Sequence, residues 1–524
     1  MAGQSLINGT LVLLFSGLFN RMLGFTYEVF MIRLIQPEGI GLFNMIYPIY
    51  VLVVVMATAG IPVAIAKLVS EEAARGNLRG AYRIFKICLF TLIASGTIFT
   101  ALCYLGASFL LKYIFINPKA YYSFLFLIPG VLIVSLCSAF RGFFQGLQQM
   151  TPTALTQSLE QLIRCVSGLL IAYMLLPKGI EYAAAGASLG VVTGELAGFV
   201  SILLIYIRKR PIVPSGFRTL HFESFYSIAV RVFNLAIPVS LTRFASTTLL
   251  WIDAVLIPKR LLANGMGLSE ATSAYGQFVG ISQSLLFAPA IITLSLATAL
   301  LPAISGALAV NNLKNVRKRC EDAVRITLIA GMPSTVVYVM LSEELCGLIF
   351  DYPKAGASLC ILALGGPFLY LAQTSTGILQ GLGKASRPFI NMVIASLFKI
   401  TGIYYLTGVP QFGVQGTSAA LVIYYMIMAL LNLADVRKYT GSEIRLHKLL
   451  LKPLFAAAGM SIVILLSKSY LSACTHSEFL VTTGRALAGM VIYVLILILN
   501  GGISINDLNR LKAVIHFKTE IKTR

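Results

Sequence analysis

Fourteen long apolar runs dominate this sequence and leave only short polar connections between them. The hydrocarbon core of a bilayer is about 30 Å thick, and a helix needs about 20 apolar residues to cross it. The runs are too continuous for the alternating strands of an outer-membrane barrel. The sequence therefore predicts an all-α integral membrane protein with fourteen transmembrane helices. We expect these helices at residues 6–33, 41–67, 84–111, 122–146, 154–176, 183–207, 226–252, 274–301, 324–349, 355–381, 388–408, 414–434, 450–470 and 480–500.

The composition excludes most soluble classes of protein. Only 12% of the 524 residues are charged and 57% are apolar, whereas a soluble domain has about 25% charged residues. A disordered chain, a coiled coil, a disulfide scaffold and an ordinary soluble enzyme are therefore ruled out. The eight cysteines are scattered without a C-x-x-C pair, which favours small buried side chains over metal ligands or disulfides.

The basic residues predict the orientation of the chain in the membrane. Lys and Arg outnumber Asp and Glu by 41 to 20, but they lie between apolar runs and not on a soluble face, so we expect no nucleic-acid partner. The even-numbered connections and the C-terminal tail hold 28 of the bases, against 9 in the N-terminal stub and the odd-numbered connections. Because cytoplasmic loops carry the excess of Lys and Arg, we predict a bacterial cytoplasmic-membrane protein with both termini in the cytoplasm.

Two sequence echoes indicate an internal repeat. Residues 57–65 read like 297–305, an offset of 240, and residues 145–147 read like 380–382, an offset of 235. Both echoes lie six predicted helices apart, and an even number of helices preserves the membrane orientation, so the halves would be parallel repeats. The alternative is chance, because Ala, Thr, Pro and Gly recur in many membrane helices.

The repeat predicts two parallel six-helix lobes around a central cavity, which is a transporter architecture. The N-terminal lobe would comprise residues 1–210 with helices 1–6, and the C-terminal lobe residues 211–440 with helices 7–12. Residues 441–524 would add helices 13 and 14 and a cytoplasmic tail.

Two of the charges within the predicted helices suggest a binding cavity. An ionisable residue near the bilayer centre costs about 3 kcal/mol on insertion scales and therefore faces a cavity or a partner. Arg21 lies about two turns from Glu28 in helix 1, and Arg243 lies in helix 7 with Asp253 near its outer end. Arginines on the first helix of each lobe predict a cationic cavity for a phosphate-bearing substrate. The alternative is a pair of structural ion pairs, Arg21–Glu28 and Arg243–Asp253.

The remaining charges within the helices are interpreted as structural or coupling groups. Glu160 and Arg164 are four residues apart, a spacing that predicts an intrahelical salt bridge. Glu195 and Lys399 have no partner visible in the sequence. Lys399 follows Arg164 by 235 residues, so we expect a base at this position in both lobes.

No motif of enzyme chemistry is present. The chain has no G-x-x-x-x-G-K-[ST] loop and no H-E-x-x-H sequence, and its four histidines lie in or near connections. We therefore expect no enzyme activity, no cofactor and no metal site. Transport without an ATP-binding loop would be driven by an ion gradient, by the membrane potential or by consumption of the substrate.

Three local stretches carry a family resemblance. They are Asn-Arg-Met-Leu-Gly-Phe at residues 20–25, Pro-Glu-Gly-Ile-Gly-Leu-Phe at 37–43 and Gly-Ile-Pro-Val-Ala-Ile-Ala-Lys-Leu-Val-Ser-Glu-Glu at 60–72. Together they resemble the polysaccharide-synthase branch of the multidrug/oligosaccharidyl-lipid/polysaccharide exporter superfamily, which includes relatives of the lipid II flippases. The resemblance implies a flippase for an undecaprenyl-diphosphate-linked saccharide, such as lipid II or a similar precursor for spore cortex, that works by alternating access.

The resemblance also implies substrate contacts in helix 1. The lipid II flippases carry Ser-Arg-x-Leu-Gly-x-x-Arg-Asp there. Arg21 and Gly24 match this pattern, Glu28 replaces its acid, Asn20 stands for its serine and Tyr27 for its second arginine.

Elsewhere the match is weaker, because the flippases' helix 2 arginine falls near Val55 and their helix 8 arginine near Gln283. Helices 13 and 14 would hold the lipid tail, as they do in that family. The substrate-binding set predicted in this way comprises Asn20, Arg21, Glu28, Arg243, Asp253 and Gln283.

The expected partners are a lipid-linked saccharide, membrane lipids, a coupling ion and cell-wall synthesis proteins. Several alternative functions are open at this stage. The nearest is an exporter of another lipid-linked glycan, and a cation-coupled multidrug antiporter would favour a cavity with more carboxylates. A membrane glycosyltransferase would need a catalytic carboxylate near a large outer loop, and a scaffold would make the cavity charges dispensable.

Overall fold

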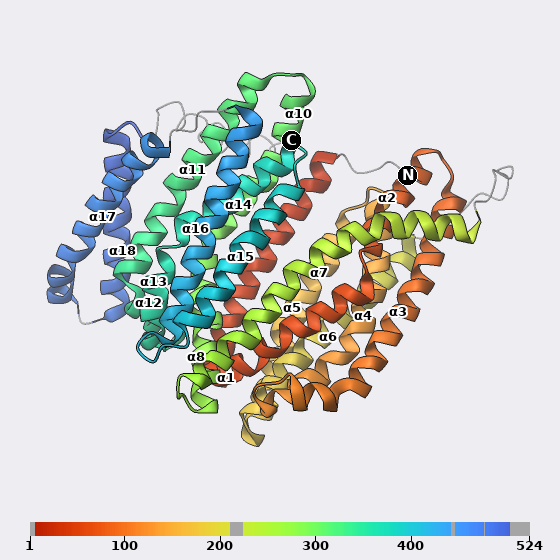
Figure 1. The fold of residues 1–524 in the computed structure, drawn as a ribbon, viewed down its shortest axis with the longest axis horizontal. Coiled ribbons are helices and arrows are strands. Elements are labelled where there is room, and N and C mark those ends of the chain that lie inside the picture. The colour runs from red at the N-terminus through yellow and green to blue at the C-terminus, as the bar shows by residue number, and fades with distance from the viewer. Residues whose placement is uncertain (1–5, 210–223, 442–445, 476, 503–524) are drawn as a thin grey trace. The chain divides into compact units, whose positions relative to one another are not determined.

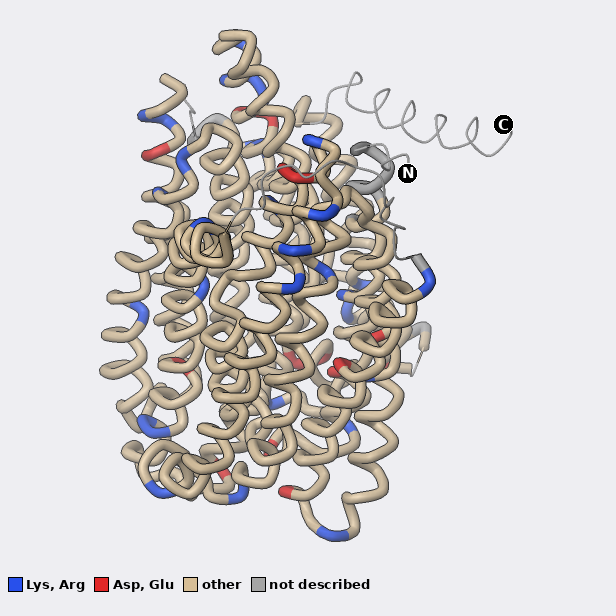
Figure 2. The backbone as a smooth tube through the Cα atoms, turned by 90° about the vertical axis from the view of Figure 1, so that its right-hand side faces the viewer, with Lys and Arg blue, Asp and Glu red and all other residues tan. Residues whose placement is uncertain are grey.

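The computed structural model describes residues 6–209, 224–441, 446–475 and 477–502, and within these ranges the chain is helical and contains no strand (Figure 1). The C-terminal tail and part of the connection before residue 224, which contribute to the predicted cytoplasmic bases, lie outside the described residues. Charged residues are sparse along the helices, as Figure 2 shows.

The chain divides into two compact units. The first comprises Met1–Gly280 together with Thr407–Val414, and the second comprises Ile281–Leu406 and Gln415–Arg524. The first unit holds α1 (Leu6–Thr58), α2 (Ile61–Ala74), α3 (Leu78–Tyr113), α4 (Tyr121–Gly146), α5 (Thr151–Leu175), α6 (Ile180–Lys209), α7 (Phe225–Ala263) and α8 (Leu268–Gly276).

The second unit begins within a π-helical segment, Gln277–Gln283. Its helices are α9 (Ser284–Phe287), α10 (Ala290–Ala309), α11 (Leu313–Met340), α12 (Ser342–Phe350), α13 (Gly356–Ala363), α14 (Gly366–Gly381), α15 (Ser386–Leu406), α16 (Gly413–Thr440), α17 (Leu446–Cys474) and α18 (Glu478–Leu499). These units are defined by contacts, whereas the boundaries 1–210, 211–440 and 441–524 follow from the repeat and stay a prediction.

Every predicted apolar run falls on helix, and 12 helices in the described part of the chain are long and apolar enough to cross a membrane. The number rises to 13 if the bent pair Pro353–Ala363 and Gly366–Gly381, which meet at 55°, forms one span. One candidate, Phe15–Ala74, has 60 residues and contains both of the first two predicted helices. Fourteen spans therefore remain a prediction.

Helix α1 is continuous across the break that the sequence predicted after residue 33, but it is kinked there. Gln36 has φ 60° and ψ 168°, and Pro37 follows it. Proline lacks a backbone N–H, clashes with the preceding turn and disfavours a helical conformation in the residue before it. The chain therefore bends without leaving the helix.

The predicted helix at 274–301 is interrupted. The π segment Gln277–Gln283 follows α8, the short helix α9 comes next, and Pro289 precedes α10. A π segment shifts the hydrogen-bond pattern by one residue, and Pro289 cannot donate a backbone hydrogen bond. The single uninterrupted helix expected here is therefore wrong.

Close glycine contacts repeat at an offset of 235 residues. A Cβ atom placed on Gly142 of α4 would lie 2.6 Å from the carbonyl oxygen of Pro62 in α2. A Cβ atom on Gly377 of α14 would likewise lie 2.6 Å from the carbonyl oxygen of Ala297 in α10. Both members of each pair differ by 235, so the packing follows the second echo. The 240-residue alignment of the first echo is wrong by five residues.

Other local features recur at the same offset. The Asn77 side chain at the start of α3 accepts a hydrogen bond from the Gly80 amide at 2.9 Å, and Asn312 at the start of α11 accepts one from the Asn315 amide at 3.0 Å. The 3₁₀ turns Pro118–Ala120 and Pro353–Ala355 have the same sequence, Pro-Lys-Ala. The two halves thus share helix caps and turns as well as helix packing.

The C-terminal helices are anchored within the second unit. Arg485 of α18 is buried, pairs with Glu344 of α12 at 3.0 Å and donates to the carbonyl oxygen of Ile464 in α17 at 3.1 Å. The Tyr493 hydroxyl donates to the carbonyl oxygen of Ile329 in α11 at 2.9 Å. Arg485 is therefore an internal anchor and not merely a charge near the end of the helix.

Seven of the eight cysteines lie in the described ranges, and all seven are free and buried or half-buried. No cluster of metal-ligating side chains occurs among the described residues.

Candidate functional site

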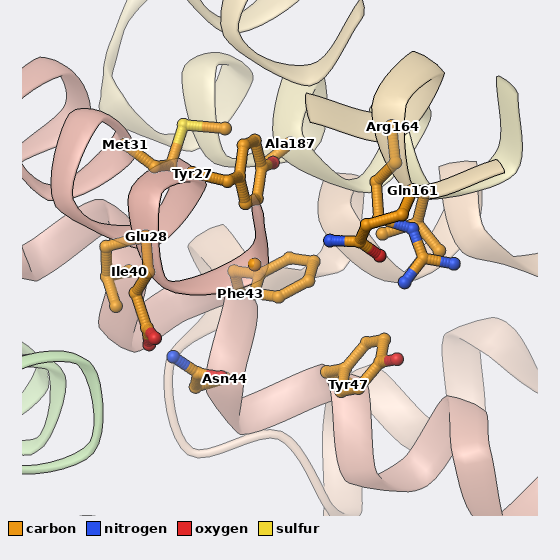
Figure 3. Close-up of a pocket in the computed structure, with 12 residues that line it drawn as sticks. Tyr27, Glu28, Met31, Ile40, Phe43, Asn44, Tyr47, Gln161, Arg164 and Ala187 are labelled. Atoms are coloured by element: carbon orange, nitrogen blue, oxygen red, sulfur yellow. The ribbon is translucent and has the colours of Figure 1, made fainter. Parts of the chain in front are cut away.

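A cavity of about 170 Å³ lies between α1, α5 and α6 of the first unit (Figure 3). The kink at Gln36 lets residues before and after it on α1 line the same space. The lining comprises Gly24, Tyr27, Glu28, Met31, Ile40, Phe43, Asn44 and Tyr47 from α1, Gln161 and Arg164 from α5, and Ala187 and Val191 from α6.

Small residues bring α5 and α6 together behind this cavity. A Cβ atom on Gly190 would collide with the backbone of Gly168, and one on Gly186 would lie 2.7 Å from the Ala172 nitrogen. Glycines at such positions let membrane helices approach closely. The close approach holds the polar residues of α5 and α6 beside one another.

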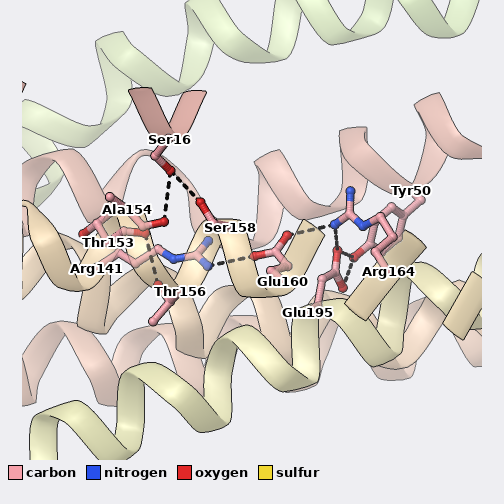
Figure 4. Close-up of polar contacts among 10 residues, drawn as sticks. All are labelled: Ser16, Tyr50, Arg141, Thr153, Ala154, Thr156, Ser158, Glu160, Arg164 and Glu195. Atoms are coloured by element: carbon pink, nitrogen blue, oxygen red, sulfur yellow. Dashed lines mark hydrogen bonds and ion pairs between the residues drawn. The ribbon is translucent and has the colours of Figure 1, made fainter. Parts of the chain in front are cut away.

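Two arginines share one carboxylate next to the cavity (Figure 4). Arg164 Nη2 lies 2.8 Å from Glu160 Oε1 on the same helix, which confirms the predicted intrahelical salt bridge. Arg141 of α4 contacts the other oxygen, Glu160 Oε2, at 2.7 Å. Glu160 therefore joins α4 to α5.

Glu195 of α6 extends this network. The Tyr50 hydroxyl of α1 lies 2.7 Å from both of its carboxylate oxygens, and Arg164 Nη2 lies 4.0 Å from its Oε1. Glu195 is 6% exposed. A buried charge is stable only when it is paired and hydrogen-bonded, and here two arginines balance two carboxylates. We call Tyr50, Arg141, Glu160, Arg164 and Glu195 the charge network.

Arg21 and Arg243 differ from the arginines of the charge network. Both are exposed, and neither side chain forms an ion pair or hydrogen bond within the part of the chain that the structure describes. The Arg21–Glu28 and Arg243–Asp253 ion pairs considered from the sequence are therefore not formed. On α7 the hydroxyls of Ser246 and Thr247 donate to the Arg243 carbonyl oxygen, each at 2.9 Å.

The other predicted site residues are dispersed. Asn20 is half-buried on α1, Asp253 is half-buried on α7, and Gln283 ends the π segment in the second unit. Of the predicted substrate contacts, only Glu28 lines the cavity. Lys399 on α15 is 5% exposed, and its Nζ lies 5.2 Å from the centre of the Tyr424 ring on α16.

Sequence reasoning missed Tyr50 and Arg141 of the charge network, as well as the cavity residues Asn44, Tyr47 and Gln161. Arg141 was counted only as a base in a connection, and its partner is 19 residues away. Tyr50 and Glu195 are 145 residues apart. A signal did exist, because Glu195 is a carboxylate within an apolar helix and therefore needs a partner.

Comparisons with known proteins place the chain. A family model described as polysaccharide biosynthesis protein matches residues 6–308, and a MatE model matches residues 270–405. Stage V sporulation protein B of Bacillus subtilis (strain 168) is 31% identical, covering 98% of this chain and 99% of that protein. Lipid II flippase MurJ of the same organism is 24% identical, covering 86% of this chain and 85% of that protein.

A solved structure shows the same fold. Lipid II flippase MurJ in an inward closed conformation superposes with a TM-score of 0.69 at 19% identity, covering 92% of this chain and 97% of the other. The resemblance inferred from residues 20–25, 37–43 and 60–72 is thus confirmed. Because one family model matches more than half of the chain and a relative above 30% identity spans nearly all of it, this protein belongs to the polysaccharide biosynthesis protein family.

Proposed function

We propose that this protein is a flippase that moves an undecaprenyl-diphosphate-linked saccharide across the cytoplasmic membrane by alternating access. The observation that carries the proposal is the state of Arg21 and Arg243, which are exposed and unpaired within the described residues on helices that can span the membrane. A guanidinium in a membrane helix is costly without a partner. Its planar fork matches phosphate oxygens in a bidentate manner, so a diphosphate headgroup would supply that partner.

The relatives support the choice of substrate. One of them is named a stage V sporulation protein and another a lipid II flippase. We therefore propose lipid II or a similar cell-wall precursor, used for spore cortex, as the substrate. An exporter of another lipid-linked polysaccharide unit is the nearest alternative.

The repeat supports the mechanism. We propose that residues 1–210 and 211–440 act as the two lobes of alternating access, with both termini in the cytoplasm. A coupling ion, the membrane potential or consumption of the substrate would drive the cycle. Membrane lipids and cell-wall synthesis proteins are the further expected partners, and no enzyme activity or cofactor enters the proposal.

The C-terminal helices within residues 441–524 are proposed to guide the lipid tail. Both helices expose large apolar side chains, among them Phe455 and Leu466 on α17 and Leu487 and Val491 on α18. The alternative role is completion of the fold, which the Arg485 anchor equally favours. A photoreactive polyprenyl-diphosphate probe should crosslink to α17 and α18 through its tail. Tail crosslinks confined to α3–α6 or to α11–α16 would contradict the role.

A cation-coupled multidrug antiporter is the second candidate, because the MatE model matches residues 270–405. An organic cation needs an unmatched carboxylate. In the first unit, Glu160 and Glu195 are matched by Arg141 and Arg164. This pairing favours the lipid-linked substrate over an organic cation.

Reconstitution tests the proposal. The full-length protein is placed in liposomes with lipid II, with a lipid-linked glycan of another sugar or with a cationic dye. We expect protein-dependent movement of lipid II to the outer leaflet, measured as accessibility of its headgroup to an added enzyme. Movement of the dye without movement of either lipid would contradict the proposal.

A further inference from the structure

We propose that the cavity between α1, α5 and α6 is a subsite for one sugar ring of the translocated headgroup. The inference rests on the proposed function and deepens it, because it separates the place where the sugar binds from the place where the diphosphate binds. Four observations within the first unit support it: the charge balance, the chemistry of the lining, the volume and the position along α1.

The charge balance disfavours a diphosphate in this cavity. Arg164 is the cation in the lining, and Glu160 at 2.8 Å and Glu195 at 4.0 Å neutralise it together with Arg141. Glu28 adds another carboxylate to the wall. A diphosphate would meet no net positive charge there, and charges of like sign repel strongly in a medium of low dielectric constant. A neutral, hydroxyl-rich ligand carries no such penalty.

The lining matches the two surfaces of a sugar ring. Phe43 and Tyr47 are stacked, with ring centres 5.3 Å apart and planes 26° apart. Such rings offer apolar faces to the C–H side of a pyranose. Asn44 and Gln161 carry amides that both donate and accept hydrogen bonds, as hydroxyl groups require. A mostly apolar wall with a few convergent polar groups is typical of small-molecule sites.

One polar atom in the wall lacks a partner. The hydroxyl of Tyr27 is buried and forms no hydrogen bond with the residues that the structure describes. A buried polar group without a partner costs about 1–3 kcal/mol. A bound hydroxyl group would remove this cost.

The volume fits one ring. About 170 Å³ corresponds to roughly six water molecules at their liquid volume of about 30 Å³ each. This space holds one monosaccharide and excludes a disaccharide, so further sugars would extend out of the cavity.

The position along α1 fits a sugar bonded directly to a diphosphate. Arg21, Gly24 and Glu28 recur at helical spacing and share a face of the helix. At 1.5 Å per residue, Gly24 lies about 4.5 Å and Glu28 about 10 Å along the axis from Arg21. Gly24 leaves open space, since a Cβ atom there would meet only Gln161 Nε2, at 3.5 Å. A diphosphate on Arg21 would therefore place its first sugar at the cavity.

A binding experiment tests the subsite. Full-length protein in detergent is titrated with undecaprenyl diphosphate and with undecaprenyl diphosphate that carries one N-acetylhexosamine. We expect the wild type to bind the sugar-bearing lipid about tenfold more tightly, the effect of one or two buried hydrogen bonds. Gln161→Ala removes an amide and Gly24→Leu fills the cavity, so both should reduce the ratio of dissociation constants to about one.

The chain offers a matched control for each variant. Gln157 is exposed on α5 one turn before Gln161, and a Cβ atom on Gly17 of α1 would meet nothing within 4 Å. Gln157→Ala and Gly17→Leu should keep the tenfold ratio. Melting curves of all four variants identify any that fail to fold.

Three outcomes would overturn the subsite. A ratio near one in the wild type, or a tenfold ratio that survives both cavity variants, contradicts the subsite but not the flippase. Saturable ²²Na⁺ binding that Gln161→Ala removes, together with a wild-type ratio of one, assigns the cavity to a cation instead. A wild type that binds neither lipid contradicts the proposed function itself, and the subsite with it.

Discussion

The α5–α6 pair of the first unit and the α15–α16 pair of the second unit are packed in a similar way but hold different polar groups. Gly190 meets Gly168 between α5 and α6, and Gly402 meets Ala420 between α15 and α16. Arg164 lies four residues before Gly168, and Lys399 lies three residues before Gly402. A base thus stands near the small-residue contact in both pairs, as the 235-residue offset predicts.

The partners of the two bases differ. Arg164 contacts the carboxylates of Glu160 and Glu195, whereas Lys399 lies over the neutral ring of Tyr424. Near Lys399 the polar contacts are amides, since Asn391 donates to Asn432 and to Asp435, each at 2.9 Å. Small residues therefore preserve the packing of the repeat, while the polar side chains are free to diverge.

Labelling tests the repeat most strongly, because its outcome is all-or-none. Lys119 and Lys354 stand in the two Pro-Lys-Ala turns, and Arg83 and Lys318 are also 235 residues apart. In parallel halves both members of a pair lie on one side of the membrane. In a background free of native cysteines, an impermeant maleimide added outside should modify Lys119→Cys, Lys354→Cys and Lys178→Cys. It should spare Arg83→Cys and Lys318→Cys. Opposite labelling of equivalent positions would refute parallel repeats.

Glu160→Gln should produce the largest loss of stability. It leaves Arg141 and Arg164 without the carboxylate that they share, and breaking a buried ion pair costs about 3–5 kcal/mol. The melting temperature in detergent should fall steeply and the yield of folded protein with it. Glu270→Gln, at an exposed position of α8, is the matched control. Equal melting temperatures for the two variants would show that the charge network is not structural.

Gly142→Ala and Gly377→Ala should cost similar amounts. Each adds a methyl group 2.6 Å from a backbone carbonyl oxygen, and overpacking of this kind costs about 1–3 kcal/mol. Thermal unfolding of both variants measures the two costs. Gly106→Ala is the control, because a Cβ atom there would meet nothing within 4 Å. A large cost at only one of the two glycines would break the equivalence of the α2–α4 and α10–α14 contacts.

Lys399→Met should have the smallest effect. The contact of a cation with an aromatic ring contributes about 1–2 kcal/mol when it is buried, and methionine keeps most of the apolar stem. The change in melting temperature should be much smaller than for Arg164→Met, which leaves Glu160 and Glu195 with one arginine fewer. A larger loss for Lys399→Met would invert the comparison between the two halves.

The sequence predicted features of short range and of strong periodicity. Apolar length placed the helices, and the four-residue spacing predicted the Glu160–Arg164 pair. The kink at Gln36 was read as a break between two helices, because proline patterns do not distinguish a bend from a termination.

The rest of the site depends on contacts between helices distant in sequence. Tyr50 meets Glu195 only because α1, α5 and α6 pack together, and no local spacing encodes that packing. The 235-residue repeat was detectable, and the identical Pro118–Ala120 and Pro353–Ala355 turns would have fixed its offset.

The central claim is that the paired arginines of the charge network stabilise the fold, whereas the unpaired Arg21 and Arg243 bind the diphosphate. The most direct test is the rate of lipid II translocation in liposomes that hold equal amounts of folded protein. Arg21→Ala and Arg243→Ala should each reduce the rate at least about tenfold, the loss expected for one charge-assisted hydrogen bond. Lys468→Ala, which removes an exposed base from α17, should keep the wild-type rate. Wild-type rates in both arginine variants would contradict the account.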